Sequence, residues 1–310
     1  MGISIDIKRI EFVVTYACSG RCKHCSVDID EEKNECIDVD YAVDVIKKLS
    51  AEYSIESVMT FGGEPLLNAE TVCKIHETAR DCGIADRSVI TNGFFSKDER
   101  KIEEVAQRLC ESGVFVLLSV DAFHQEFIPI EPVMRFAEAF IRNDVSRLKV
   151  HPAWLVDRQF KHSYNDETER LLKMFSDKGI EVSSGNNIFP AGNALKYLRE
   201  YYPCPENIDL SVPCGQMLYT SRLDEIREIS INPNGDLNLC RFPIGNIYKD
   251  DVVSILNKYD PQESPVTRAL MDGGAGRLLE YAENLGAAVD TSDCYSACGV
   301  CRKCIKALGE

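Results

Sequence analysis

The stretch that decides the fold lies near the start of the chain and reads Ile10-Glu-Phe-Val-Val-Thr-Tyr-Ala-Cys18-Ser-Gly-Arg-Cys22-Lys-His-Cys25. Its first part, Ile10 to Thr15, is rich in β-branched and aromatic residues, which is typical of a strand. The three cysteines therefore follow the carboxyl end of a strand. Active sites gather at that end in parallel sheets and barrels, so we expect the chemistry of this protein to lie there.

Three thiols on one short loop favour an iron–sulfur cluster. A four-iron cluster normally takes four cysteine thiolates, and three from one loop leave one iron open to another ligand. Zinc or a disulfide is the alternative on spacing alone. Structural zinc needs four ligands, and the start of the chain has no signal-peptide pattern, which argues against disulfides.

Composition limits the classes of function. The chain has 310 residues, of which 45% are hydrophobic, enough for one large or two ordinary domains. No apolar run reaches the ~18 residues of a membrane span, so we expect a cytoplasmic protein without a membrane partner. The net charge of -15 disfavours nucleic acid and favours a neutral or basic substrate. The 14 cysteines gather toward the two ends, which indicates metal binding.

From residue 10 to about 185, strand-like runs alternate with helix-like runs. The predicted strands are Ile10–Thr15, Ser57–Phe61, Ser88–Thr91, Val114–Val120, Leu148–Val156 and Ile180–Ser183. The predicted helices are Val39–Leu49, Ala69–Cys82, Asp98–Glu111, Pro132–Arg142 and Asn165–Lys178. Six strand–helix units predict an α/β fold, a partial (β/α)6 barrel like a TIM barrel, with a doubly wound open sheet as the alternative.

Polar residues follow the later strands at the edge where a ligand would bind. Gly62-Gly63-Glu64-Pro65 follows the second strand, Asn92-Gly93 follows the third, and Ser119, Asp121 and His124 lie at the fourth. Paired glycines let the backbone approach a ligand closely, and a glutamate can accept hydrogen bonds from an ammonium group. On its own, Gly-Gly before Glu-Pro equally fits a turn followed by a helix start.

The pattern changes near residue 190, where glycines and prolines interrupt the alternation. We place a domain boundary there, giving domains 1–190 and 191–310. The second domain should contain a β-hairpin, Glu228–Ile231 with Leu237–Cys240, and helices near Asp251–Tyr259 and Arg277–Asn284. Its cysteines are Cys204, Cys214, Cys240, Cys294, Cys298, Cys301 and Cys304. They suffice for a complete second cluster, with zinc as the alternative.

With these residues in view, the chain resembles radical S-adenosylmethionine (SAM) enzymes that carry a C-terminal auxiliary-cluster domain of the SPASM or twitch type. Cys18, Cys22 and Cys25 match the family's CxxxCxxC motif, and residues 62–65 match its GGEP motif. The resemblance implies two four-iron clusters and a SAM site. The residues that it places at SAM are Gly62, Gly63, Glu64, Pro65, Thr91, Asn92, Ser119, Asp121 and His24, the last at a position that is usually aromatic. The second cluster would use Cys214, Cys240, Cys298 and Cys301, with Cys294, Cys304 and Cys204 as substitutes.

The resemblance also implies an activity. Such enzymes cleave SAM reductively, and the 5'-deoxyadenosyl radical then abstracts a substrate hydrogen; the protein positions the reactants and excludes water. We expect a ribosomally made peptide as substrate, a reductant such as flavodoxin or ferredoxin, and a separate peptide-recognition protein. A twitch-type dehydrogenase of a small alcohol or protein side chain is the alternative, with Asp121 and His124 as candidates for the second proton. Other classes are an iron–sulfur electron-transfer protein and a zinc-stapled binding module.

Overall fold

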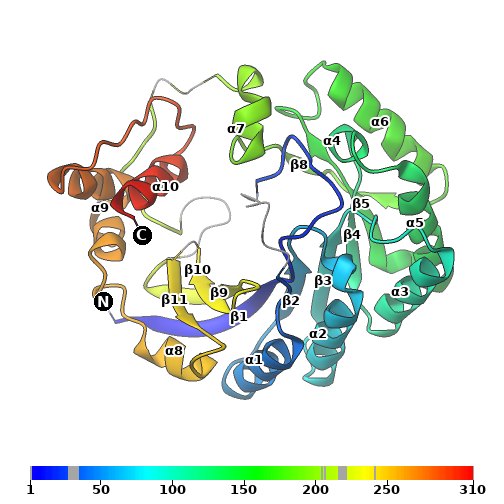
Figure 1. Cartoon of the computed structure of the whole chain (residues 1–310), viewed down its shortest axis with the longest axis horizontal. Helices are drawn as coiled ribbons and strands as arrows, with labels where there is room; N and C mark the ends of the chain where they lie inside the picture. The colour runs from blue at the N-terminus through cyan, green and yellow to red at the C-terminus, as the bar shows by residue number, and fades with distance from the viewer. Residues whose placement is uncertain are drawn as a thin grey trace.

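The computed structural model describes residues 2–26, 35–203, 205, 207–215, 222–240 and 242–309. Its centre is a nine-stranded sheet in the order β11-β10-β9-β1-β2-β3-β4-β5-β7, which curves into an open barrel (Figure 1). The strands of the repeated unit are β1 (Ser4–Val13), β2 (Ser57–Phe61), β3 (Asp86–Thr91), β4 (Phe115–Ser119), β5 (Leu148–His151) and β7 (Glu181–Val182), and neighbours in this series are parallel. Their spatial order follows the chain without the reversal of a doubly wound sheet, which confirms the barrel prediction.

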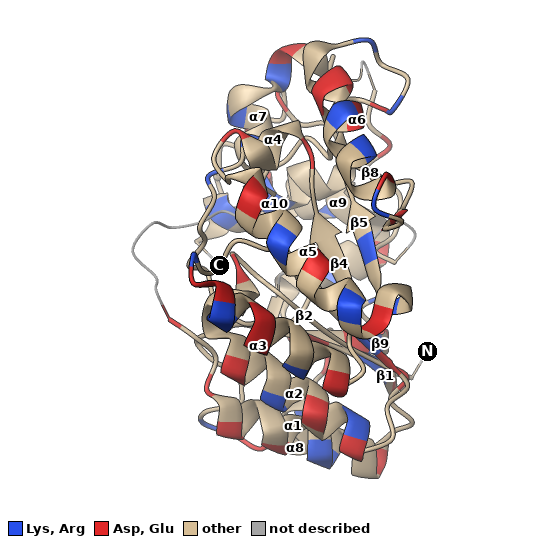
Figure 2. Ribbon diagram, turned by 90° about the vertical axis from the view of Figure 1, so that its right-hand side faces the viewer, with Lys and Arg blue, Asp and Glu red and all other residues tan. Residues whose placement is uncertain are grey.

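Helices cover the outer face of this sheet. They are α1 (Val39–Glu52), α2 (Ala69–Asp81), α3 (Glu99–Glu111), α5 (Ile130–Asp144) and α6 (Ser163–Ser176). Alternate strand residues such as Ile10 and Phe12 are fully buried in the core beneath them. The outward sides of α1, α2, α3 and α5 carry charges of both signs (Figure 2). Short segments complete this region: η1 (Pro65–Asn68), α4 (Ala122–Gln125), η2 (Val145–Arg147), β6 (Ala153–Trp154), β8 (Asn186–Asn187), α7 (Asn193–Tyr197) and η3 (Arg199–Tyr201).

The predicted hairpin is present and gains a third strand. It consists of β9 (Glu225–Ile231), β10 (Asp236–Leu239) and β11 (Phe242–Asn246). β9 pairs with β1 in parallel, with Ile229 beside Ile10, so these strands extend the barrel sheet. The hairpin therefore does not form a separate sheet, and the division into domains 1–190 and 191–310 stays a proposal.

Three helices follow the hairpin: α8 (Val252–Lys258), α9 (Pro265–Asn284) and α10 (Ala297–Leu308). The predicted helix from residue 277 is the second part of α9, which bends at Gly273 and Gly274. α10 was not among the predicted helices, since its cysteines were considered only as possible cluster ligands. Ser296 caps its first turn by accepting from the Gly299 N–H, and Gly309 ends it at φ 76°.

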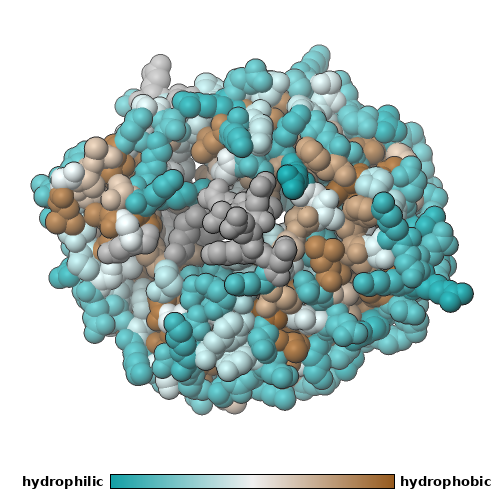
Figure 3. Space-filling view, in the orientation of Figure 1, coloured by the Kyte–Doolittle hydropathy of each residue, from teal (hydrophilic) through white to brown (hydrophobic). Residues whose placement is uncertain are grey.

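The face in Figure 3 is mainly hydrophilic, with hydrophobic residues in separate patches. In the described part of the chain, no helix is long and apolar enough to cross a membrane.

Candidate functional site

The cysteine loop follows β1 directly, as the sequence predicted. Cys22 is buried, and Cys18 and Cys25 are half-buried. Burial raises the pKa of the Cys18 thiol to about 11, and the negative charges of Glu64 and Cys25 add to that rise. Burial also raises the pKa of Cys22, with further contributions from Asp121 and the other two thiols. Three thiolates this close are unfavourable alone and suit a positively charged iron centre, so the donor set fits a cluster.

The backbone of Gly63 and Glu64 holds the start of the cysteine loop against the end of β2. The Gly63 N–H donates to the Thr15 carbonyl at 2.7 Å, and the Glu64 N–H donates to the Ala17 carbonyl at 2.8 Å. A Cβ atom on Gly63 would lie 2.2 Å from the Ala17 oxygen. The backbone can approach the loop this closely only because residue 63 has no side chain.

Glu64 is fully buried, and its carboxylate is bonded to the chain itself. Oε1 accepts from the Leu66 N–H at 2.9 Å and from the Thr91 hydroxyl at 2.6 Å, and Oε2 accepts from the Asn92 N–H at 2.7 Å. Burial raises its pKa to about 7, although these three bonds favour the ionised form. Glu64 thus ties the end of β2 to the end of β3. Pro65, also buried, begins η1.

Asn92 connects β3 to the cysteine loop. Its Nδ2 lies 3.7 Å from the Cys18 sulfur and 3.2 Å from the Ser19 hydroxyl, and its Oδ1 accepts from the Phe94 N–H at 2.8 Å. The predicted SAM-site residues Glu64, Thr91 and Asn92 are therefore brought together beside the first cysteine.

Asp121 occupies a fully buried position at the end of β4. Oδ1 accepts from the N–H groups of Phe123 and His124, each at 3.0 Å. Oδ2 meets His124 Nδ1 at 2.8 Å and accepts from the Ala153 N–H at 3.1 Å. Burial opposes ionisation, yet His124 and His24 hold the pKa of Asp121 below its usual range. These four partners occupy the acceptor positions of the carboxylate, which thereby orients His124. Of the two candidates for the second proton, His124 is therefore the one that still has a nitrogen not bonded to Asp121. Ser119, also buried, precedes it at the end of β4.

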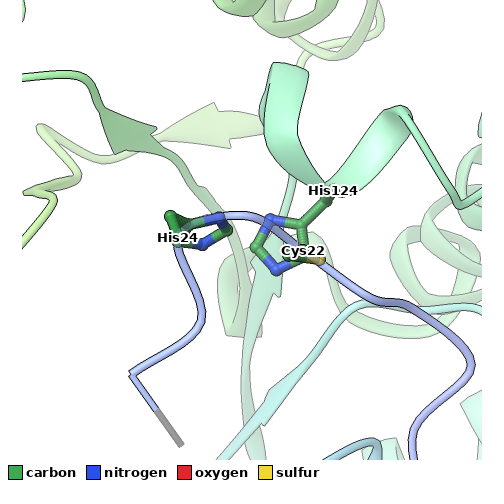
Figure 4. A group of neighbouring side chains, drawn as sticks. All are labelled: Cys22, His24 and His124. Carbon is green, nitrogen blue, oxygen red and sulfur yellow. The ribbon is translucent and has the colours of Figure 1, made fainter. Parts of the chain in front are cut away.

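The rings of His24 and His124 lie next to each other, with Cys22 close to His124 (Figure 4). Their ring centroids are 4.7 Å apart, and the three residues offer ligand atoms within 4.8 Å of one another. Burial lowers the pKa of His24 to about 4, so its ring is neutral at pH 7. The ring also packs against Phe123 with centroids 5.2 Å apart. A neutral, half-buried ring fits the position that the resemblance assigns to packing near adenine.

The four cysteines predicted for the second cluster lie near one another. Burial raises the pKa of Cys214 to about 11, and the charges of Cys240 and Cys298 raise it further. The pKa of Cys301 is also raised, first by burial and then by the charges of Cys214, Cys240 and Cys298. Cys240 follows β10 with a positive φ of 54°, a strained backbone for a non-glycine residue. Of the substitutes, Cys294 and Cys304 are buried in the small core between α9 and α10, and Cys204 lies outside the described residues.

One contact to the cysteine loop was missed by the sequence analysis. Asn193, at the start of α7, bonds to the backbone of Cys22 and Cys25. It is 171 residues from Cys22, and an ordinary Gly-Asn pair gives no signal of such a contact.

Comparisons with known proteins bear on the family and on the fold. The model of the radical SAM superfamily matches residues 12–194. A probable GTP 3',8-cyclase of Methanocaldococcus jannaschii is 27% identical over 154 residues, which cover 47% of this chain and 49% of that protein, so the match spans about half of that relative. A second probable GTP 3',8-cyclase, from Saccharolobus solfataricus, is 23% identical over 305 residues, covering 86% of this chain and 93% of the relative.

Solved structures show the same fold. Streptococcus suis SuiB bound to its precursor peptide SuiA has a TM-score of 0.61 at 15% identity, with 97% of this chain and 77% of SuiB covered. The structure of anSMEcpe with bound AdoMet has a TM-score of 0.55 at 14% identity, with 97% and 96% covered. At these identities the likeness concerns the fold alone.

Proposed function

This chain belongs to the radical SAM superfamily, and from that premise we propose that it modifies a peptide by hydrogen abstraction. The hydrogen-abstraction part of the proposal rests on the Cys18–Cys22–Cys25 loop, which is anchored beside Glu64 and Asn92 at the ends of parallel strands. When bound there, a four-iron cluster supplies the electron that breaks a carbon–sulfur bond of SAM. The three thiols hold the cluster, and Asn92 supplies a donor near the Cys18 sulfur.

We further propose that Cys214, Cys240, Cys298 and Cys301 hold a second four-iron cluster. The proximity of the four thiols and the partial burial of Cys214 and Cys301 support this set, and a full set of four thiolates leaves no open iron. Such a cluster would act in electron transfer, taking the electron that a crosslinked or oxidised product leaves behind.

The side chains on the inner face of the sheet indicate which kind of substrate the barrel favours. Thr60 of β2 faces α2, where its hydroxyl lies 2.8 Å from His76, so the neighbouring Met59 faces the inside of the barrel. Arg9 lies 3.3 Å from the Met59 sulfur and therefore shares that face. Its guanidinium is 2.7 Å from the Glu11 carboxylate.

These charges favour a neutral or cationic substrate. Burial raises the pKa of Glu11, and Glu228 adds negative charge beside it. On β5, Lys149 is paired with Glu181 at 2.7 Å. Because Arg9 and Lys149 are both paired with carboxylates, they are poorly placed to bind a triphosphate. A peptide with a basic segment fits this acidic setting better, and electron transfer from flavodoxin or ferredoxin would start the reaction.

The names of the two relatives favour a second candidate, cyclisation of GTP. A third is oxidation of a small alcohol, for which the paired Asp121 and His124 are the candidates for handling the second proton.

One experiment separates these candidates. Reduced, cluster-loaded protein is incubated with SAM and, separately, with peptides encoded by neighbouring genes, with GTP, and with a panel of sugars and cyclitols. We expect 5'-deoxyadenosine to rise only with a peptide, together with a peptide mass change of about two units or a deuterium shift in D2O. Release that rises with GTP or a small alcohol and never with a peptide would assign the substrate to that class.

A further inference from the structure

The Cys22–Cys25 turn is held by a segment from the far end of the barrel. The Asn193 N–H donates to the Cys25 carbonyl at 2.9 Å, and its side-chain Nδ2 donates to the Cys22 carbonyl at 3.1 Å. The Cys22 carbonyl also accepts from the Cys25 N–H at 3.2 Å, which closes the turn. One residue thus fixes both ends of the turn that carries two of the three predicted ligands.

Gly192 makes this approach possible. Its φ is +55°, a conformation that side chains rarely adopt, and a Cβ atom there would lie 2.7 Å from the Cys25 carbonyl oxygen. The neighbouring Ser26 backbone would be 3.2 Å away. A substitution would therefore push Asn193 off the turn.

The segment is itself fixed to the barrel. Ala194 of α7 and Leu198, which follows that helix, are buried in a small core with Phe123, Leu155 and Ile188. Phe123 in turn packs on the ring of His24, which lies between Cys22 and Cys25. The turn is therefore held through its backbone by Asn193 and beside its His24 side chain by Phe123.

We propose that Asn193 is a positioning residue that keeps the Cys22–Cys25 turn in its cluster-binding shape before the cluster arrives. The part that concerns the cluster rests on the proposed function; the part that concerns the turn rests on geometry alone. Three thiolates and SAM must reach the same cluster. A turn that is already held in shape should therefore speed cluster assembly and slow iron loss.

The test uses two variants with matched controls. Asn193→Ala removes the side-chain donor, and Gly192→Ala displaces the whole segment. Asn143→Ala removes a similar amide-to-carbonyl bond, 3.0 Å long, inside α5. Gly179→Ala introduces the same backbone strain at φ +77°, where a Cβ atom would meet nothing within 4 Å.

The first readout needs no cluster. In cluster-free protein, hydrogen–deuterium exchange of the peptide covering residues 16–26 should become about five- to tenfold faster in Asn193→Ala and faster still in Gly192→Ala, because one or more bonds to the turn are lost. In both controls, exchange in this peptide should equal that of the unchanged chain. Equal exchange in Asn193→Ala and the unchanged chain would overturn the proposal.

The second readout uses reconstituted protein. Transfer of iron from the SAM-responsive cluster to a chelator, followed through the change that SAM makes in the electron paramagnetic resonance signal, should be about five- to tenfold faster in Asn193→Ala. Unchanged iron transfer would overturn the cluster part of the proposal. If the unchanged chain takes up no iron, the proposed function fails, while the exchange result still decides whether Asn193 holds the turn.

Discussion

The role of Glu64 can be tested by changing it to glutamine and measuring stability and SAM binding together. At pH 8 the carboxylate is ionised, since its pKa is about 7, and it accepts three hydrogen bonds. In Glu64→Gln, the amide oxygen can accept two of them, but the amide nitrogen would face the Asn92 N–H, donor against donor. Leaving these groups unpaired in a buried site should lower the free energy of unfolding by about 1–3 kcal/mol.

SAM binding should also weaken, by about tenfold, because the variant removes a negative charge from the site where an ammonium group is expected. Thr91→Val is the matched control, since it removes one donor to Glu64 and keeps the charge. It should lower stability by about 1 kcal/mol and change the SAM dissociation constant by less than about threefold. Urea unfolding of cluster-free protein and calorimetric SAM titration of loaded protein give the two values.

Two results would refute this reasoning. Unchanged stability in Glu64→Gln would mean that the three hydrogen bonds do not hold the ends of β2 and β3 together. Equal loss of SAM affinity in Glu64→Gln and Thr91→Val would mean that the effect passes through structure and that the charge itself contributes nothing to SAM binding.

Three further predictions concern separate parts of the molecule. Gly63→Ala should abolish cluster binding, because its Cβ atom would overlap a loop carbonyl, while Gly83→Ala, with nothing within 4 Å, should keep full iron content; iron assay checks both. The unchanged chain should bind about eight irons, and the double variant Cys298→Ala, Cys301→Ala should lose about half while keeping the SAM-induced spectral change. Burial lowers the pKa of His76 from 6.5 to about 3, so the unfolded chain binds a proton between these values that the folded chain does not. Stability should therefore fall by up to about 5 kcal/mol as pH drops through this window, and urea unfolding of His76→Gln should show a correspondingly smaller slope.

Much of the fold could be predicted because local pattern and tertiary structure agree there. The strand Ser57–Phe61 was predicted with the observed bounds, since its apolar run ends at the turn residues Gly62 and Gly63. The predicted helix starts at Val39 and Ala69 follow from helical periodicity. Asp38 caps the helix that starts at Val39, which confirms that start. The pairing of β9 with β1 was not predictable in this way, because strand pairing between distant residues leaves no periodic signal.

In the candidate site, too, some features could be predicted from the sequence and others could not. Its cysteines and glycines could be found from sequence because their spacing is dictated by the group that they bind. The partners of Asp121 could not be found, since three of its four hydrogen bonds come from backbone N–H groups, which every residue except proline offers. A carboxylate that looked like a candidate proton carrier is thereby engaged in orienting His124.

β1 links both cysteine sets. Its carboxyl end leads into the loop of Cys18. On the side opposite β2, it pairs with β9, with Phe12 beside Ile231. Ile231 pairs in turn with Leu237 of β10, which runs on to Cys240. Two strand pairings therefore separate the first cysteine set from a member of the second. Because a hydrogen-bonded sheet resists stretching more than a loop linker does, the spacing between the two proposed clusters should stay fixed while substrate binds, as electron transfer between them would require.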